Sequence, residues 1–331
     1  MNSKINFSHD VKSVAKPWTH LNFRGGEGDD FSFAIIGDRS GRPQADYFEQ
    51  SIQKANMLNP DFIMSVGDFI RGISVEDQSE EFIRMQWQEV TPVVEKSRAP
   101  FFYVVGNHDI GPREDRWPEV HDIEENVWKD LFGVTYYYFI RRGVLFLCLH
   151  STDPFEDIGE EQLAWAIETL KQHEDVRWTM IFMHRPGTWN EPNFSKLEEA
   201  LYHRNYTVFA GDLHMYTRYH RNGRKYIQCG TCGGGYDTSK GSRGVNFGEV
   251  HHITWVSFQD GEPQITAIEL DGIRYDDWVT VNSLTYLTAN YFRGDKLISD
   301  EELAALKKEG IKVSQLRVTD ILKRAEEINA E

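Results

Sequence analysis

Short apolar runs alternate with segments of helical periodicity over the first third of the chain. Continuous apolar runs are typical of buried strands, whereas apolar residues that recur every three to four positions indicate amphipathic helices. The resulting order is strand 31–36, helix 44–58, strand 62–66, helix 80–95 and strand 101–105. Strands that alternate with helices in this way predict parallel pairing through right-handed crossovers.

The pattern shifts toward β-hairpins in the second half of the chain. Asn222-Gly223 and Asp260-Gly261 separate paired apolar runs, and such dipeptides favour tight hairpin turns. The expected elements are strands 136–140, 144–150, 178–183, 207–210, 217–221, 225–229, 251–258 and 264–270, with helices 162–172 and 196–203. The stretch 233–248, rich in Gly, Ser and Lys, is expected to be a long mobile loop. Together these elements predict an α/β (α+β) domain.

The composition becomes helical beyond about residue 280. Ser299 and Glu302 form a capping box, and Gly310 suits the end of that helix. A second helix is expected over 314–329. We therefore expect a domain at 1–280 and a helical C-terminal appendage at 281–331. This appendage would pack on the domain or on a partner subunit, so a homo-oligomer is one arrangement it allows.

The charge balance narrows the range of partners. The chain has 52 acidic and 36 basic residues, a net charge of −16, and an acidic surface repels phosphate backbones. General nucleic-acid binding is therefore not expected. The first twenty residues lack an apolar stretch long enough for a signal peptide, and the runs 144–149 and 180–183 are too short to span a membrane. We expect a soluble, cytoplasmic protein with no membrane partner.

Two of the three cysteines, Cys229 and Cys232, have C-x-x-C spacing. This spacing could indicate redox chemistry or half of a zinc site. There is no second C-x-x-C, and glycines follow the motif where a thioredoxin-type helix would begin. A strand end that holds two thiols is the interpretation we favour, and Cys148 lies in an apolar strand as a core residue.

Polar side chains with metal-binding groups follow five of the expected strands. Taken singly, each could be an Asx turn, a helix cap or a hydrogen-bonded structural histidine. In a parallel sheet, however, the carboxyl ends of strands converge on one crevice, and glycines allow sharp turns there. The five segments are Gly37-Asp38-Arg39-Ser40, Gly67-Asp68, Gly106-Asn107-His108-Asp109, His184-Arg185-Pro186 and Gly211-Asp212-Leu213-His214. Five such strand ends in order predict a metal site.

The order D…GD…GNHD…H…GxxH resembles the calcineurin-like metallophosphoesterase superfamily, which includes purple acid phosphatases and calcineurin-type protein phosphatases. The resemblance covers about residues 30–270. It implies a four-layer αββα sandwich, two metal ions drawn from Fe, Mn and Zn, and hydrolysis of phosphate esters.

The resemblance also implies a role for each matching residue. Asp68 would bridge the two metals. Asp38 and His214 would hold the first metal, and Asn107 and His184 the second. Two cations held close together need a shared anion to offset their repulsion, and together they activate water and bind phosphate oxygens.

The catalytic residues that the resemblance implies lie in the third of these segments. His108 would protonate the leaving oxygen without binding metal, and Asp109 would orient His108. This proton-delivery pair is intact in the chain.

Two motifs depart from the family pattern. D-x-H is replaced by Asp38-Arg39-Ser40, and G-H-x-H by Gly211-Asp212-Leu213-His214. Ser40 offers only a weak neutral oxygen, whereas the Asp212 carboxylate can replace the imidazole on the second metal. More oxygen ligands favour Mn²⁺ or Mg²⁺ over Zn²⁺. We therefore expect weaker metal affinity than in the family, with one firmly held and one exchangeable ion.

Several residues next to these motifs are candidates for the pocket. Arg39 could bind the substrate phosphate bidentately or form a salt bridge to Asp68 or Asp212. Trp189 and Asn190 could line the pocket or form an exposed loop tip. Arg71 and Arg185 are weaker candidates, and the loops 111–123, 153–159, 185–194 and 233–248 would set specificity.

The sequence thus predicts a metal-dependent phosphoesterase that acts on a small phosphorylated molecule. A degenerate member that binds a ligand or partner without hydrolysis is the alternative, because two imidazoles are missing. The intact pair of His108 and Asp109 favours the enzyme.

Overall fold

The computed structural model describes residues 7–24, 28–41, 43–44, 46–74, 77–111, 118–152, 157–236, 244–259, 261–270, 272, 274–275 and 280–281. These residues all belong to one compact unit, Met1–Asn282. The helices expected within 299–329 lie outside the described residues, as does part of the loop expected at 233–248. The proposed domain boundary near residue 280 therefore stays a prediction.

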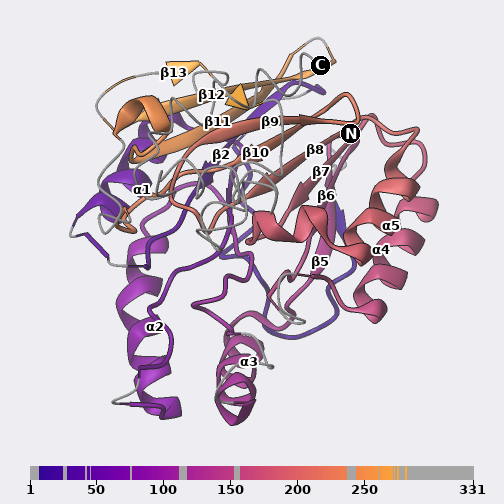
Figure 1. Ribbon diagram of the computed structural model, residues 1–331. Coiled ribbons are helices and arrows are strands. Elements are labelled where there is room, and N and C mark those ends of the chain that lie inside the picture. Colours follow the sequence, from indigo (N-terminus) through magenta and orange to yellow (C-terminus); the bar gives the residue numbers. More distant parts are fainter. Residues whose placement is uncertain are drawn as a thin grey trace, which may run out of the picture. The chain divides into compact units, whose positions relative to one another are not determined.

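Two mixed β-sheets form the centre of the described unit (Figure 1). The six-stranded sheet has the order β13 (Arg274–Tyr275), β12 (Pro263–Glu269), β11 (His252–Phe258), β2 (Phe31–Ile36), β3 (Phe62–Ser65) and β4 (Phe101–Phe102). β2, β3 and β4 are parallel, as the strand–helix alternation predicts, and β11 joins β2 antiparallel. The ordered ladder of β4 is shorter than the apolar run 101–105 suggests.

The eight-stranded sheet contains the hairpin predicted at Asn222-Gly223, whereas β11 and β12, which flank the other predicted turn, pair in the six-stranded sheet. Its order is β1 (Phe7–His9), β5 (Tyr137–Arg141), β6 (Val144–Cys148), β7 (Trp178–Phe182), β8 (Tyr206–Ala210), β10 (Arg224–Gln228), β9 (Thr217–Arg221) and β14 (Thr280–Val281). β6, β7, β8 and β10 run parallel. Asn222 and Gly223 both have positive φ, as a type I′ hairpin turn between β9 and β10 requires.

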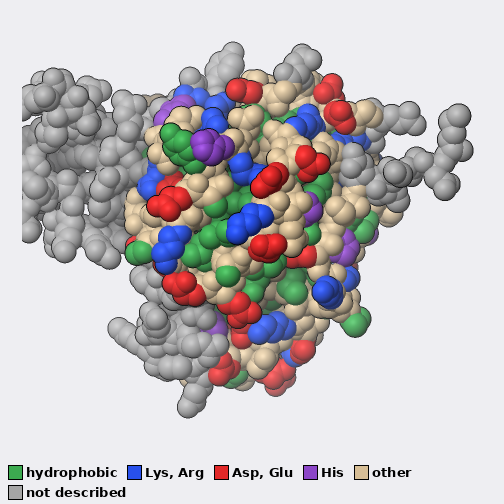
Figure 2. Space-filling view, turned by 90° about the vertical axis from the view of Figure 1, so that its right-hand side faces the viewer, with side chains coloured by type: hydrophobic (Ala, Val, Ile, Leu, Met, Phe, Trp, Pro, Cys, Tyr) green, Lys and Arg blue, Asp and Glu red, His purple; other side chains and the backbone are tan. Residues whose placement is uncertain are grey.

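Helices flank the two sheets. α1 (Tyr47–Leu58) and α2 (Glu80–Val94) lie on one side in Figure 1, and α4 (Glu160–Gln172) and α5 (Pro192–Leu201) lie together on the other. Figure 2 shows acidic and basic side chains interspersed over the face that α4 and α5 cover, so the net negative charge is not gathered there. The predicted αββα sandwich is confirmed. Among the described helices, none combines the length and hydropathy needed to cross a bilayer.

A further helix, α3 (Pro118–Phe132), occupies part of the segment expected to be a specificity loop. Its residues Val127, Trp128 and Phe132 belong to the apolar cluster that includes Trp87 of α2 and Phe101 of β4. This burial stabilises the helix in the fold. The loop prediction for residues 118–123 is therefore wrong.

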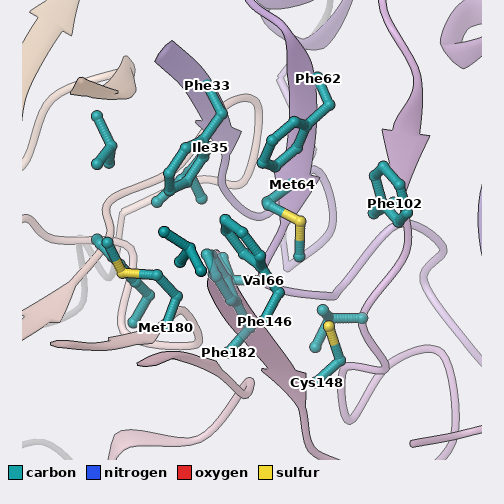
Figure 3. Packing of buried hydrophobic residues seen from close by; sticks show 14 of the residues in the cluster. Phe33, Ile35, Phe62, Met64, Val66, Phe102, Phe146, Cys148, Met180 and Phe182 are labelled. Atoms are coloured by element: carbon teal, nitrogen blue, oxygen red, sulfur yellow. The ribbon is translucent and has the colours of Figure 1, made fainter. Parts of the chain in front are cut away.

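The alternation of side chains along β2 explains why its last four residues, 33–36, are all apolar. Phe33 and Ile35 belong to the cluster between the two sheets, whereas Ala34 and Ile36 belong to the cluster beneath the helices. Both faces of the strand are thus buried. Figure 3 shows the cluster between the sheets, with residues of β2 and β3 facing Phe146 and Phe182 of the other sheet. Each buried Phe contributes about 1.5–3 kcal/mol by removal of apolar surface from water.

Candidate metal centre

The parallel strands of both sheets end at the same place, and the predicted ligands come together there. Asp38 follows β2, Asp68 follows β3 and Asn107 lies beyond β4, all from the six-stranded sheet. The eight-stranded sheet supplies His184 after β7, with Asp212 and His214 after β8. Contacts across the sheets join the two groups: the N–H of Asp212 donates to Oδ2 of Asp38 at 2.7 Å.

The first group consists of Asp38, Asp68 and His214, whose potential ligand atoms all lie within 4.8 Å of one another. Nδ1 of His214 donates to the Gly235 carbonyl at 2.6 Å, and Nε2 lies 3.4 Å from Oδ2 of Asp38. A neutral imidazole that donates from Nδ1 has a lone pair on Nε2. This second hydrogen bond to a backbone carbonyl is the usual way in which proteins orient a metal-binding histidine.

His184 has the same arrangement in a more crowded setting. Its Nδ1 donates to the Val66 carbonyl at 2.7 Å. Its Nε2 lies 2.9 Å from Oδ1 of Asn107, 3.2 Å from Oδ1 of Asp68 and 3.6 Å from Oδ1 of Asp212. Neither ionised carboxylate can donate to a lone pair on Nε2. The arrangement therefore suits a cation between these atoms, or a protonated imidazole.

Three buried oxygen atoms in this region have no hydrogen-bond partner among the described residues: Oδ1 of Asp38, Oδ2 of Asp212 and Oγ of Ser40. Buried polar groups are normally paired, and an unpaired buried carboxylate oxygen is costly. Divalent cations satisfy such oxygens, so the donor set fits a metal. Two imidazole nitrogens and three carboxylates are available, together with the Asn107 amide oxygen.

Burial and the neighbouring charges shift the pKa values of the three carboxylates in the site. Burial raises the pKa of Asp38, although the neighbouring His214 and His184 oppose the shift. Burial acts in the same direction on Asp68, but the charges of His184 and His108 lower its pKa below the ordinary value. Arg185 and His184 similarly outweigh burial and lower the pKa of Asp212. Asp68 and Asp212 are thus held as anions.

The backbone of three candidate ligands is in the left-handed region, with φ of 65° at Asp68, 71° at Asp212 and 53° at His214. Such conformations cost about 1–3 kcal/mol each and cluster at functional sites. Glycine allows the loops to meet: a Cβ atom on Gly106 would lie 2.3 Å from Oδ1 of Asp68. A larger residue there would displace the central carboxylate.

Asp109 does not orient His108, contrary to the prediction. Its carboxylate accepts from the N–H groups of Asp68 at 2.8 Å, Phe69 at 2.8 Å, Ile70 at 3.2 Å and Gly106 at 2.9 Å. Burial and the nearby Asp68 charge raise the pKa of Asp109 to about 7, against these hydrogen bonds. The Asp109 side chain points toward the loop after β3, where its carboxylate accepts hydrogen bonds from the backbone N–H groups of residues 68–70. Asp109 therefore holds the left-handed Asp68 in place.

His108 is oriented by the backbone instead. Its Nδ1 donates to the Arg71 carbonyl at 2.9 Å, and its Nε2 lies 4.0 Å from Oδ2 of Asp68. The side chain is 38% exposed, so Nε2 lies at the edge of the carboxylate cluster within reach of solvent. Burial lowers the pKa of His108, but the Asp68 charge and the Arg71 carbonyl raise it above the ordinary value overall. This favours the protonated imidazole.

Arg39 is held by α2 and by the loop after β3. Its Nη1 donates to the Phe69 carbonyl at 2.9 Å, and its Nη2 lies 3.9 Å from Oε2 of Glu89. The structure shows an ion pair for Arg39, and the binding of a substrate phosphate by this residue stays a prediction. The partner in this ion pair is Glu89, whereas the sequence analysis named Asp68 or Asp212.

Trp189 is a core residue, contrary to both alternatives weighed for it. It is fully buried on a 3-10 helix, η1 (Pro186–Asn190), and contacts Tyr219 and Tyr226 edge-on at 5.5 Å and 5.3 Å between ring centroids. Asn190 at the end of η1 is exposed. Trp189 therefore anchors the segment after His184 by packing in the core.

The two thiols of the C-x-x-C segment are free and buried. Cys232 accepts from the N–H of Gly37 at 3.3 Å and donates to the His252 carbonyl at 3.0 Å. Burial raises the pKa of Cys232 to about 12, and that of Cys229 higher still. Thiols that remain protonated in the interior are poor nucleophiles. These observations favour the strand-end interpretation over redox chemistry.

Ser151 is a supporting residue that the sequence analysis missed. Its Oγ accepts from the N–H groups of His184 at 3.1 Å and Arg185 at 3.0 Å. Ser151 follows β6 in the polar run His150-Ser151-Thr152, so the strand-end pattern used for the other residues could have identified it.

A comparison with models of known protein families finds a match. The family model described as calcineurin-like phosphoesterase matches residues 31–230. Among curated proteins, no significant sequence match is found.

Three solved structures illustrate the range of similar folds. GAP50, the anchor in the inner membrane complex of Plasmodium, is 13% identical with a TM-score of 0.47, over 86% of this chain and 96% of that one. A 5'-nucleotidase from Candida albicans is 16% identical with a TM-score of 0.45, over 94% and 60%. Vps29 complexed with Zn²⁺ from Entamoeba histolytica is 14% identical with a TM-score of 0.35, over 72% and 92%.

Proposed function

Because the chain belongs to the calcineurin-like phosphoesterase family, we propose that it hydrolyses a phosphoester of a small molecule with the help of divalent metal ions. One observation carries the proposal. The Nε2 atoms of His184 and His214 face a shared group of buried carboxylates, and His108 lies at the edge of that group. This combines candidate metal ligands with a candidate proton donor in a single site.

The candidate ligands form two overlapping sets. Asp38, Asp68 and His214 would hold one ion. Asn107, His184 and Asp212 would hold the other, with Asp68 as the anion common to both. Bound divalent ions would supply Lewis-acid stabilisation of the phosphoryl oxygens and activation of water.

The donor set favours Mn²⁺ or Mg²⁺ over Zn²⁺. Asp212 replaces an imidazole with a carboxylate, and Ser40 replaces another with a neutral hydroxyl. Oxygen donors suit hard cations, whereas nitrogen and sulfur donors suit zinc. The third carboxylate also offsets more of the positive charge in the site.

His108 is the proposed general acid. The Arg71 carbonyl fixes the proton of His108 on Nδ1 and sets the plane of the ring, so that Nε2 is the atom available to the substrate. Protonated at Nε2, the imidazole would give its proton to the leaving oxygen as the phosphoester bond breaks. A raised pKa keeps this proton present near neutral pH.

The replaced imidazoles also support a second candidate, a protein of this fold that binds metal or ligand without hydrolysis. Substitution of His108 by Ala separates the two. For an enzyme, His108→Ala should retain bound Mn²⁺ and lose about 10²–10⁴-fold in rate on an aryl phosphate, the usual contribution of a general acid. His203→Ala, at an exposed position after α5, is the matched control.

Each outcome of this experiment has a definite meaning. A wild-type rate in His108→Ala would contradict the proposed role of His108. A wild-type protein that binds Mn²⁺ but hydrolyses no phosphomonoester or phosphodiester would favour the binding protein.

A further inference from the structure

The loop that carries Asp68 is held by side chains from outside it. The three N–H groups of residues 68–70 donate to Asp109. Further along, the N–H of Arg71 donates to Gln86 at 2.8 Å and that of Ile73 to Glu124 at 3.2 Å. Side chains therefore take the place of a regular hydrogen-bonded ladder over this segment.

Gln86 has the most specific position of these groups. It lies on α2 and is 2% exposed. Its Oε1 accepts from the N–H of Arg71, and its Nε2 donates to the carbonyl of Gly72 at 3.0 Å. The Gln86 amide thus forms hydrogen bonds with backbone groups on both sides of the Arg71–Gly72 peptide.

That peptide is also the one that orients the candidate general acid. Its carbonyl, from Arg71, accepts from Nδ1 of His108 at 2.9 Å. On its other side, a Cβ atom on Gly72 would lie 2.6 Å from the backbone oxygen of His108, and Gly72 has a φ of 72°. The peptide is therefore in contact with both the ring and the backbone of His108.

We propose that Gln86 is a positioning residue for His108, acting through the Arg71–Gly72 peptide. The proposal rests on the proposed function, in which His108 delivers a proton. It assigns to α2 a role in setting the direction of the His108 Nε2 atom.

The chemistry of the position explains why an amide suits it. A glutamine side chain presents an acceptor to Arg71 and a donor to Gly72 at the same time. A carboxylate would face the Gly72 carbonyl without a proton to share, and an apolar side chain would leave both backbone groups unpaired. Freed from Gln86, the peptide could rotate and take the His108 ring with it. Misplacement of a catalytic group by about 1 Å can cost on the order of 10²-fold in rate.

The test compares two substrates with different needs for acid catalysis. An ester with a good leaving group, p-nitrophenyl phosphate, needs little protonation, whereas phenyl phosphate needs more. In Mn²⁺-loaded protein, Gln86→Met should lower kcat on phenyl phosphate about tenfold more than on p-nitrophenyl phosphate, within the range that acid catalysis supplies. Gln88→Met, an exposed substitution on the same helix, should leave both rates unchanged.

A double-mutant comparison separates positioning from general damage. If Gln86 acts through His108, adding Gln86→Met to His108→Ala should lower the rate little further. Equal losses on both substrates, or an undiminished effect in the His108→Ala background, would overturn the proposal. Should Gln86→Met fail to fold, Gln86→Glu retains the acceptor for Arg71, removes the donor for Gly72 and allows the same comparison.

An activity-free readout keeps this proposal distinct from the proposed function. The ¹⁵N shifts of the His108 ring report which nitrogen carries the proton. In metal-free protein at a pH above the pKa of His108, where the ring is neutral, wild type and Gln88→Met should show the proton on Nδ1. Under the same conditions, Gln86→Met should show a mixture of tautomers. If wild type hydrolyses neither ester, the proposed function fails, and an unchanged tautomer in Gln86→Met would then overturn the role of Gln86 as well.

Discussion

The Nε2 atom of His184 lies 2.9 Å from the Oδ1 atom of Asn107, while the other ring nitrogen of His184 donates to a backbone carbonyl. Either a proton on Nε2 or a metal ion that both atoms bind would account for this contact with Asn107, and the proposed function assigns it to the metal. We therefore expect His184→Ala to remove one of two bound Mn²⁺ ions and to leave the ion at Asp38 and His214. Titration of metal-free protein by calorimetry measures the stoichiometry, and unchanged binding would exclude His184 as a ligand.

Asp212 should determine which metal the second site prefers. The left-handed backbone at this position suits Asp, Asn and His better than other residues, so Asp212→His is compatible with the fold. We expect this substitution to raise the affinity for Zn²⁺ relative to Mn²⁺ by about tenfold, or about 1.4 kcal/mol. Competition between the two ions for metal-free protein measures the ratio. A ratio equal to that of wild type would show that Asp212 does not contact the metal.

Asp109 should matter for stability even without metal. It accepts four backbone N–H groups in the interior, and an asparagine would turn an N–H₂ group toward some of them. Loss of charged hydrogen bonds and unpaired amides should lower the free energy of unfolding of Asp109→Asn by about 2–4 kcal/mol. Urea denaturation in the presence of a chelator measures this difference. No change would mean that the loop after β3 does not depend on this carboxylate.

The buried ion pair between Arg141 and Asp61 provides a second stability test. Nε and Nη2 of Arg141 donate to the two oxygens of Asp61 at 2.8 Å and 2.9 Å. Removal of one partner leaves a buried charge. Asp61→Ala should therefore lower the free energy of unfolding by about 3–5 kcal/mol. The exposed pair between Arg84 and Glu80 is the control, and Glu80→Ala should cost at most about 1 kcal/mol. Similar losses in the two variants would contradict the importance of burial.

His252 should make the fold sensitive to acid. Burial lowers its pKa from an ordinary value of 6.5 to about 4. Between these pH values the unfolded chain binds more protons than the folded chain, so stability falls as the pH is lowered through this window. The shift at His252 should lower the free energy of unfolding by about 3 kcal/mol over the whole window. Denaturation of wild type and His252→Gln at pH 7 and pH 4 should show a smaller loss in the variant, and equal losses would count against the shift.

Most of the fold could be predicted because the positions of apolar residues along the chain indicate which side chains are buried. β2 is apolar at successive positions since one face packs between the sheets and the other under helices. The turn at Asn222 and Gly223 could be predicted for a similarly local reason, because both residues need positive φ. α3 was missed although Val127 and Trp128 are buried, since its first residues were assigned to a loop.

The strand-end residues could also be predicted, whereas their exact partners could not. The sequence places Asp109 next to His108, but the direction of a side chain in a tight turn depends on which amides lie beneath it. Arg39 pairs with Glu89, a residue fifty positions away on α2. Such contacts depend on how helices pack on the sheet, which motif spacing does not specify.

The most direct test of the central claim is the rate of aryl phosphate hydrolysis by metal-free protein as Mn²⁺ is added back, with bound metal measured on the same samples. We predict that the rate rises with occupancy, that Mn²⁺ is more effective than Zn²⁺, and that His108→Ala binds the metal but stays slow. Full metal occupancy with no hydrolysis of any phosphoester tested, or no metal binding at all, would contradict the claim.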